Sequence, residues 1–147
     1  MASVAVGGTF DILHDGHKAL LKKAYALGDV VIGLVTDKMA LEKAHIVNTY
    51  DARKEALTAY IRELTGIDPV IIELNDPCGP TLKERFDYIV VSPDTIYTAR
   101  EINKIRANHG LPPIEIVCVD FVRAQDGQPI SSTRIHRGEI NEHGVLL

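Results

Sequence analysis

The sequence predicts a single α/β domain built on a doubly wound, Rossmann-like sheet of five parallel strands. Short apolar runs alternate along the chain with longer amphipathic segments, which is the pattern of successive β-α-β units. The run at 30–35 is apolar at nearly every position, as expected of a parallel strand covered on both faces. The chain has 147 residues, the usual size of one domain with a sizeable core. We therefore assign residues 1–147 to a single domain.

Five apolar runs bounded by glycine, proline or polar residues are the expected strands. The first is a short run that we expect to break at Gly7 and Gly8. The last contains Cys118, which we expect to lie in the core. The expected strands cover residues 4–6, 30–35, 70–74, 88–91 and 114–119.

Five segments with apolar residues at helical spacing are the expected helices. In the first of them the apolar side chains share one face and the lysines share the other. Gly66 follows the third segment as a C-cap glycine would, and Gly110 follows the fourth. The expected helices cover residues 17–27, 37–43, 51–65, 97–109 and 132–137.

Four of the loops that follow expected strands are rich in glycine, proline and polar residues. The carboxyl ends of parallel strands meet at one edge of the sheet, and ligands bind beyond that edge where the strand order reverses. We therefore expect these loops to form one ligand site. They are residues 7–17, 76–80, 92–95 and 125–132.

The most informative motif is Gly-Gly-Thr-Phe-Asp-Ile-Leu-His-Asp-Gly-His at residues 7–17. Its glycines let backbone N–H groups approach a ligand closely, and the helix that starts at its end attracts anions. His14 and His17 straddle that helix start, with Gly16 between them, so both rings can point at one phosphoryl group. A neutral imidazole donates one hydrogen bond and an imidazolium donates two. The motif therefore predicts a polyphosphate site.

This motif resembles the first signature of the nucleotidyltransferase superfamily of the Thr/His-x-Gly-His type. Residues 127–135, Gly-Gln-Pro-Ile-Ser-Ser-Thr-Arg-Ile, resemble the second signature of that superfamily. With residues 76–80 and 90–95, Asn103 and Arg106, the set is most similar to the phosphopantetheine adenylyltransferases of the archaeal and eukaryotic type. The resemblance implies direct in-line transfer of AMP from ATP to 4′-phosphopantetheine in coenzyme A biosynthesis, giving dephospho-coenzyme A and pyrophosphate.

The resemblance also implies which residues are catalytic. His17 would contact the α-phosphate in the transition state, and His14 would hold neighbouring phosphate oxygens. Lys43 would bridge the donor and acceptor phosphates, and Lys38 is the alternative for that role. Either lysine can instead be a solvated helix charge, since exposed lysine is the commonest case. The attacking phosphate oxygen is already ionised, so no general base is needed.

The expected binding residues lie in all four loops. Ser131, Ser132 and Thr133 suit the β- and γ-phosphates, although simple N-capping would also explain hydroxyls at a helix start. Arg53 is either a family arginine or an exposed helix charge. The residues expected to bind ATP are Gly8, Thr9, Phe10, His14, His17, Ser92, Arg106, Ser131, Ser132, Thr133 and Arg134. Those expected to bind 4′-phosphopantetheine are Thr9, Lys43, Asp76 and Gly79.

Two acidic residues of the first motif have expected structural roles. Asp11 should brace the loop by accepting hydrogen bonds from backbone N–H groups. Asp15 should be the N-cap of the following helix, since a carboxylate aimed at the phosphates would repel them.

Composition limits the partners of this chain. No His, Cys and carboxylate cluster has metal-ligand spacing, so we expect no metal site on the protein and Mg²⁺ to arrive with ATP. The net charge of −4 argues against non-specific binding to nucleic acid or anionic membranes. No apolar stretch reaches the ~20 residues that span a bilayer, and no signal-peptide pattern opens the chain. We expect a cytoplasmic enzyme of small-molecule substrates, and an oligomer is compatible with the sequence.

Two other functions compete with this interpretation. One is a different nucleotidyltransferase of the same superfamily, either a cytidylyltransferase or an FAD-forming adenylyltransferase. Cytidylyltransferases usually carry Arg-Thr-x-Gly-Ile-Ser-Thr in the second signature, and residues 128–134 lack its Arg-Thr lead. The other is a nucleotide-binding regulatory module without catalysis, which the presence of both histidines and the Ser-Ser-Thr run disfavours.

Overall fold

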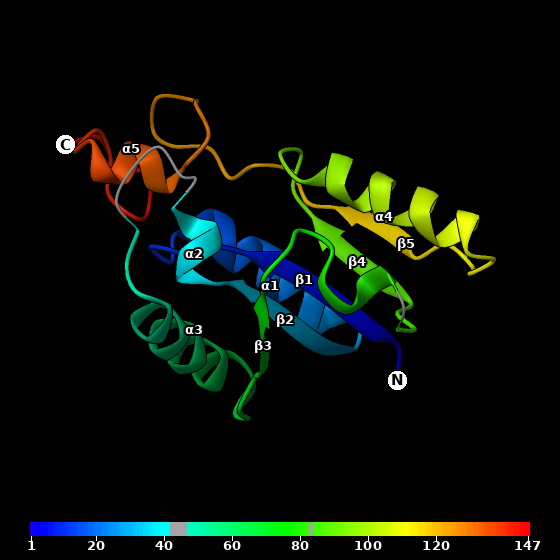
Figure 1. Cartoon of the computed structure of the whole chain (residues 1–147). Coiled ribbons are helices and arrows are strands. Elements are labelled where there is room, and N and C mark those ends of the chain that lie inside the picture. The colour runs from blue at the N-terminus through cyan, green and yellow to red at the C-terminus, as the bar shows by residue number, and fades with distance from the viewer. Residues whose placement is uncertain (42–46, 83) are drawn as a thin grey trace.

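The computed structural model describes residues 1–41, 47–82 and 84–147 (Figure 1). Five parallel strands form one sheet in the order β3-β2-β1-β4-β5, which confirms the predicted doubly wound topology. The chain reverses its direction of sheet growth between β1 and β4, so these neighbours form the switch point where ligands of such sheets bind. The strands are β1 Ser3–Gly8, β2 Asp29–Val35, β3 Val70–Leu74, β4 Tyr88–Val91 and β5 Glu115–Cys118.

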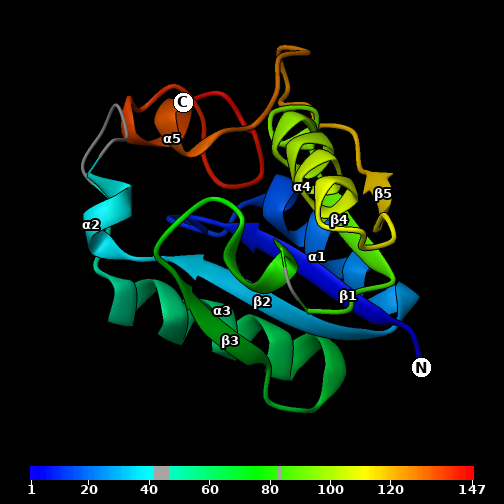
Figure 2. The ribbon, with the colours of Figure 1, turned by 45° about the vertical axis from the view of Figure 1, so that its right-hand side comes forward.

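Helices cover both faces of the sheet (Figure 2). One core cluster joins alternate residues of β1 and β2 to the apolar faces of α1 and α3, and a second joins the opposite face to α4. This two-sided burial explains the continuously apolar strands. The helices are α1 Asp15–Leu27, α2 Asp37–Ala40, α3 Tyr50–Thr65, α4 Ile96–Asn108 and α5 Ser132–His136, with a 3₁₀ turn η1 at Gly79–Leu82.

The β1 strand is longer than predicted. Gly7 and Gly8 do not break it, because they continue the parallel ladder opposite Gly33 and Leu34 of β2. The absence of side chains on Gly7 and Gly33 leaves room for Leu74, whose Cδ1 would lie 3.1 Å from a Cβ at Gly7 and 2.7 Å from one at Gly33. These glycines therefore make space over the sheet rather than ending the strand.

Several local predictions can be judged against these bounds. The C-cap at Gly66 is confirmed, with a left-handed φ of 78°. The prediction that Asp15 caps α1 is wrong, because His14 occupies the N-cap position and Asp15 is the first helical residue. Cys118 is exposed rather than buried, because β5 is an edge strand. The predicted end of the second helix, including Lys43, lies outside the described residues.

The C-terminal part of the chain returns to the carboxyl edge of the sheet. α5 and the C-terminus lie beyond the end of the sheet toward which β1 points (Figure 1). The backbone N–H of Asp15 donates to the carbonyl of Glu142 at 3.0 Å, and Nδ1 of His143 lies 3.0 Å from Oδ1 of Asp15. These contacts hold the C-terminal segment against the start of α1.

Candidate active site

A pocket of about 540 Å³ opens at the carboxyl edge of the sheet, across the switch point between β1 and β4. Its wall combines residues from the loops after β1, β3, β4 and β5 with the first residues of α5. The four loops therefore line one pocket, and its use as a ligand site stays a prediction. Of the residues expected to bind substrates, the pocket wall contains Gly8, Thr9, Phe10, His14, His17, Ser92, Ser131, Ser132 and Thr133.

His14 caps α1 with its own ring. Its Nδ1 accepts the backbone N–H groups of Gly16 at 3.0 Å and His17 at 3.3 Å, which satisfies two donors at the helix start. A ring nitrogen that accepts carries no proton, so the proton of neutral His14 is on Nε2. Burial lowers the pKa of His14 to about 4, against an opposing contribution from Asp15. At neutral pH His14 is a fixed, neutral donor.

His17 lies on top of His14 in a close stack. The ring centroids are 3.7 Å apart with 17° between the planes. Burial lowers the pKa of His17 to about 3, with His14 acting in the same direction and with a hydrogen bond to Ile12 and the charge of Asp11 opposing it. Two stacked imidazoles in a buried site cannot both be protonated without a large cost in desolvation and charge repulsion. Both rings of the stack are therefore neutral at neutral pH.

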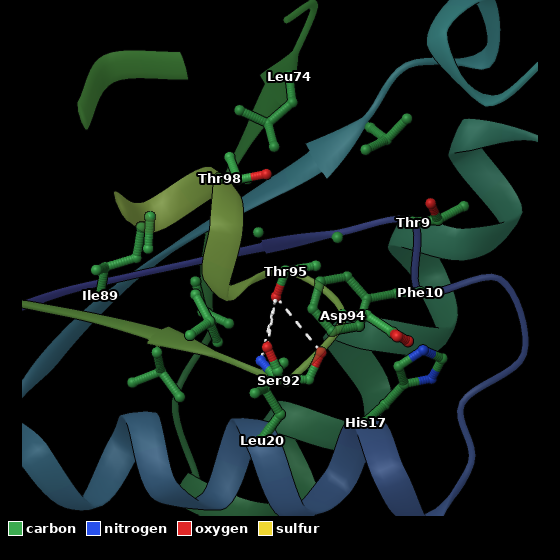
Figure 3. Close-up of a pocket in the computed structure, with 18 of the residues that line it drawn as sticks. Thr9, Phe10, His17, Leu20, Leu74, Ile89, Ser92, Asp94, Thr95 and Thr98 are labelled. Carbon is green, nitrogen blue, oxygen red and sulfur yellow. Dashed lines mark hydrogen bonds between the residues drawn. The ribbon is translucent and has the colours of Figure 1, made fainter. Parts of the chain in front are cut away.

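Phe10 holds His17 from the other side. Its ring centroid lies 5.2 Å from that of His17, tilted by 56° (Figure 3). The backbone of Phe10 has a φ of 46°, a left-handed conformation that is uncommon for a bulky residue and concentrates at functional sites. Gly8 permits this packing, since a Cβ there would lie 3.1 Å from the Phe10 ring. Phe10 therefore contributes its ring to the site as well as the backbone that the sequence suggested.

A buried arginine supports the loop after β1. Arg53 is fully buried, so the alternative of an exposed helix charge is wrong. Its Nη1 donates to the carbonyl of Thr9 at 2.9 Å, its Nε donates to the carbonyl of Asn48 at 2.8 Å, and its Nη2 pairs with Asp37 at 3.2 Å. Arg53 does not line the pocket. It fixes the backbone of Thr9, which does.

Asp11 braces the same loop, as predicted. Its Oδ1 accepts the backbone N–H of Asn48 at 2.8 Å, and its Oδ2 lies 2.6 Å from Nε2 of His136. The second of these partners comes from α5 and was not expected from the sequence.

In the second signature segment, defined as residues 127–135, the hydroxyls divide between two roles. Ser131 caps α5, with its Oγ accepting the N–H of Arg134 at 3.2 Å, so the capping interpretation holds for this residue. Ser132 and Thr133 line the pocket in the first turn of the helix. Arg134 does not line the pocket, and its expected contact with phosphate stays a prediction. Its guanidinium pairs with Asp126 and Glu139.

Arg106, which was expected to bind ATP, is held by backbone carbonyls in this structure. It is 3% exposed and lies outside the pocket wall. Its Nε donates to the carbonyl of Pro112 at 2.9 Å, and its Nη1 donates to those of Thr81 at 2.8 Å and Glu84 at 2.9 Å. A buried guanidinium needs many acceptors, and three backbone carbonyls from two loops supply them. Arg106 therefore stabilises the loop after β3, and its expected contact with ATP stays a prediction.

Asp76 and Gly79, which were expected to contact the acceptor, build the turn after β3 and do not line the pocket. Asp76 Oδ1 accepts the N–H groups of Cys78 at 3.0 Å and Gly79 at 2.8 Å, which builds the turn. Gly79 has a φ of 54°, and a Cβ there would lie 2.5 Å from Cδ2 of Leu74. Both residues shape the loop, and Pro77, Cys78 and Pro80 provide its pocket wall.

The structure does not show which of the two candidate lysines would bridge the reacting phosphates. Lys43 lies outside the described residues. Lys38 is exposed on α2 and does not line the pocket. Among the described residues, no group of three or more His, Cys, Asp or Glu side chains is arranged to hold a metal ion.

Some wall residues had no signal in the sequence. Leu74 lies over the glycines of β1 and β2, and Figure 3 shows it across the pocket from Ser92. Residues 119–122, directly after β5, complete the wall on the other side. Only their position after a strand could have indicated them. Ser92 itself is held in a turn, with its N–H donating to Oγ1 of Thr95 at 3.1 Å.

Comparison with known proteins agrees with this geometry. Residues 5–138 match the model of the cytidylyltransferase-like family, so fold and site define a nucleotidyltransferase of that class. The chain is 52% identical to phosphopantetheine adenylyltransferase of Methanosarcina acetivorans over 99% of its length and 96% of that protein. It is 44% identical to the enzyme of that name from Archaeoglobus fulgidus, over 98% and 99%. The chain belongs to the phosphopantetheine adenylyltransferase family.

A solved structure from the second organism shows the same architecture. It is described as a protein of unknown function from Archaeoglobus fulgidus, is 41% identical, and superposes with a TM-score of 0.78 over 80% of this chain and 89% of that one. Within the described residues, no helix is both long enough and apolar enough to traverse a bilayer.

Proposed function

We propose that this chain transfers AMP from ATP to 4′-phosphopantetheine, releasing pyrophosphate and forming dephospho-coenzyme A. The observation that carries the proposal is the single pocket that joins two neutral histidines to the hydroxyls of a second phosphate-binding segment. Relatives at 44–52% identity over nearly the full length, named for this activity, support the choice of donor and acceptor.

The reaction needs positioning and charge stabilisation more than covalent help. The 4′-phosphate of the acceptor is already ionised at neutral pH, so one of its oxygens attacks the α-phosphorus of ATP in line and pyrophosphate leaves. No base is required. His17 donates to the α-phosphate as charge develops on it, and His14 donates to neighbouring oxygens from its Nε2. A neutral imidazole has one N–H, which is enough to donate a hydrogen bond to one phosphate oxygen.

The remaining assignments follow the layout of the pocket wall. The backbone of Gly8, Thr9 and Phe10 would receive the phosphates between the histidines and the sheet. Ser132 and Thr133 would hold the β- and γ-phosphates, while Ser131 orders their helix. Ser92 would lie near the nucleoside, and Lys43 or Lys38 would bridge the two reacting phosphates. Mg²⁺ would enter with ATP and keep several of its waters.

Three further properties belong to the same proposal. The chain would act as one nucleotidyltransferase domain spanning residues 1–147. It would work in the cytoplasm on small-molecule substrates, without nucleic acid or membrane. Its association state could be monomeric or oligomeric.

The test is pyrophosphate release in the presence of Mg²⁺, with ATP or CTP, each with and without 4′-phosphopantetheine. Release that requires both ATP and 4′-phosphopantetheine is the expected result. Release with CTP would contradict the proposal in favour of a cytidylyltransferase. If ATP binds but the pair is inactive, flavin mononucleotide replaces the acceptor, and activity with it would identify an FAD-forming enzyme instead.

A further inference from the structure

We propose that His136 is a positioning residue that aligns the two phosphate-binding segments of the pocket through Asp11. The inference rests on the function proposed above. Nε2 of His136 lies 2.6 Å from Oδ2 of Asp11, across 125 positions of sequence. Asp11 belongs to the first signature segment, residues 7–17, and lines the pocket. His136 is the last residue of α5, whose first turn lines the pocket with Ser132 and Thr133.

The Asp11 carboxylate accepts a hydrogen bond from His136. Asp11 is 5% exposed, and a buried carboxylate is costly unless its oxygens are hydrogen-bonded. Its Oδ1 accepts the N–H of Asn48, so Oδ2 is the atom that His136 serves. Because a carboxylate only accepts, Nε2 of His136 is the donor. This bond holds a negative charge in one orientation at the wall of a pocket built for anions.

The helix α5 depends on tertiary contacts for its orientation. It has five residues, and isolated helices of that length are not stable in water. Ile135 packs with Ile130 and Ile140, and Arg134 pairs with Asp126 and Glu139. All of these contacts lie within the C-terminal part of the chain. The bond from His136 to Asp11 instead joins α5 to the loop at the end of β1.

This link connects the groups that the reaction must align. On one side of it are the stacked histidines, and on the other are the hydroxyls of the second signature segment. The α-phosphorus must sit between these groups with the leaving pyrophosphate in line. A displacement of about 1 Å at such a site can cost about 10²-fold in rate. His136 therefore acts on catalysis through Asp11, without touching the substrate.

The test compares His136→Phe with His136→Gln in steady-state assays of the proposed reaction. His136→Phe keeps a ring of similar size but removes the donor, and we expect kcat to fall about 10²-fold with the KM for ATP little changed. His136→Gln keeps an N–H near the position of Nε2 and should recover most of the kcat. If His136 were needed only for folding, its substitution would lower the melting temperature and the fraction of active enzyme. It would not lower kcat selectively over KM, and His136→Gln would not recover kcat selectively.

His143→Phe is the matched control. His143 also pairs with an aspartate of the first signature segment, with Nδ1 3.0 Å from Asp15 Oδ1. That pair is exposed, at 54% and 36% of the two side chains, and Asp15 does not line the pocket. We expect His143→Phe to keep the kcat of the wild type.

A double-mutant cycle with Asp11→Asn completes the test. If His136 acts through Asp11, His136→Phe adds little to the loss already caused by Asp11→Asn. Unchanged kcat in His136→Phe, failure of His136→Gln to recover it, or independent losses in the cycle would each overturn the inference. If His136→Phe does not fold, His136→Asn, whose shorter amide cannot reach Oδ2 in the same place, takes its part. Inactivity of the wild type would instead count against the proposed function.

Discussion

The rings of His14 and His17 stack with centroids 3.7 Å apart, and the Nδ1 of the first accepts the backbone N–H of the second. This relationship caps the start of α1 with the ring of His14. Because the stack is buried, both rings are neutral at neutral pH. The arrangement predicts how turnover, acid stability and variant stability should change.

The first prediction concerns turnover. His17→Ala should lower kcat by about 10²–10³-fold, the usual cost of one donor that acts on developing charge, while the affinity for ATP changes far less. Steady-state kinetics and titration calorimetry with ATP alone measure the two effects. His109→Ala, at the exposed C-terminal end of α4, is the control and should behave as wild type. A collapse of ATP affinity with turnover preserved would show that His17 binds the ground state instead.

The second prediction concerns acid stability. The pKa of His14 is lowered to about 4 and that of His17 to about 3, whereas both are about 6.5 in the unfolded chain. Between these values the unfolded state binds more protons than the folded state, so stability rises with pH there. The stability contributed by the two neutral histidines is fully present above about pH 6.5 and is lost as the pH falls toward 4.

Melting temperatures between pH 7.5 and 5 test this, because that range lies above most carboxylate titrations. The wild type should lose stability steadily below pH 6.5. His17→Gln, which keeps polar atoms but does not titrate, should show a shallower loss. Equal pH slopes in the two proteins would mean that the buried histidines are not the source of the acid sensitivity.

The third prediction separates the structural from the catalytic interpretation of Arg106. Arg106→Leu leaves the carbonyls of Thr81, Glu84 and Pro112 without their donor, and should cost about 3 kcal/mol of unfolding free energy. The folded variant should keep its KM for ATP. Arg100→Leu, on the exposed face of α4, should change stability by less than about 0.5 kcal/mol in the same denaturant titration. A raised KM for ATP in Arg106→Leu with normal stability would instead support a contact between Arg106 and phosphate.

The fourth prediction concerns the floor of the pocket. In Gly33→Ala the new Cβ would lie 2.7 Å from Cγ and Cδ1 of Leu74, which must move, and we expect a loss of about 1–3 kcal/mol. Leu74→Ala alone should also destabilise, because it removes a buried side chain. In the double variant the clash is gone, so the total loss should be smaller than the sum of the two. Additive losses in chemical denaturation would show that Leu74 does not respond to this position.

The fold was largely readable from the sequence because its signals are local. The spacing of apolar residues and the overall apolarity are properties of short segments. The strands at Val70–Leu74 and Tyr88–Val91 were therefore predicted with the bounds that they have. The histidines were also found this way, since a turn, a glycine and a helix start are adjacent in the chain. The resemblance to nucleotidyltransferases then ordered the remaining segments, and the parallel sheet brought their loops to one edge.

The partners of charged side chains could not be read in the same way. Arg106, Arg134 and Asp76 carry the right chemistry for phosphate or acceptor, yet each is used by a nearby backbone or carboxylate. The sequence does not show whether such a side chain binds a ligand or another part of the protein, because that depends on which groups are buried together.

The sequence by itself determined the class of fold, the edge of the sheet at which the pocket opens and the two histidines that line it. Tertiary structure decided that both histidines are neutral, that Arg53 and Arg106 support loops, and that His136 meets Asp11. The physical reason is burial. It sets which ionisable groups keep their charge and which donors a buried acceptor must find, and it exists only once distant segments have packed together.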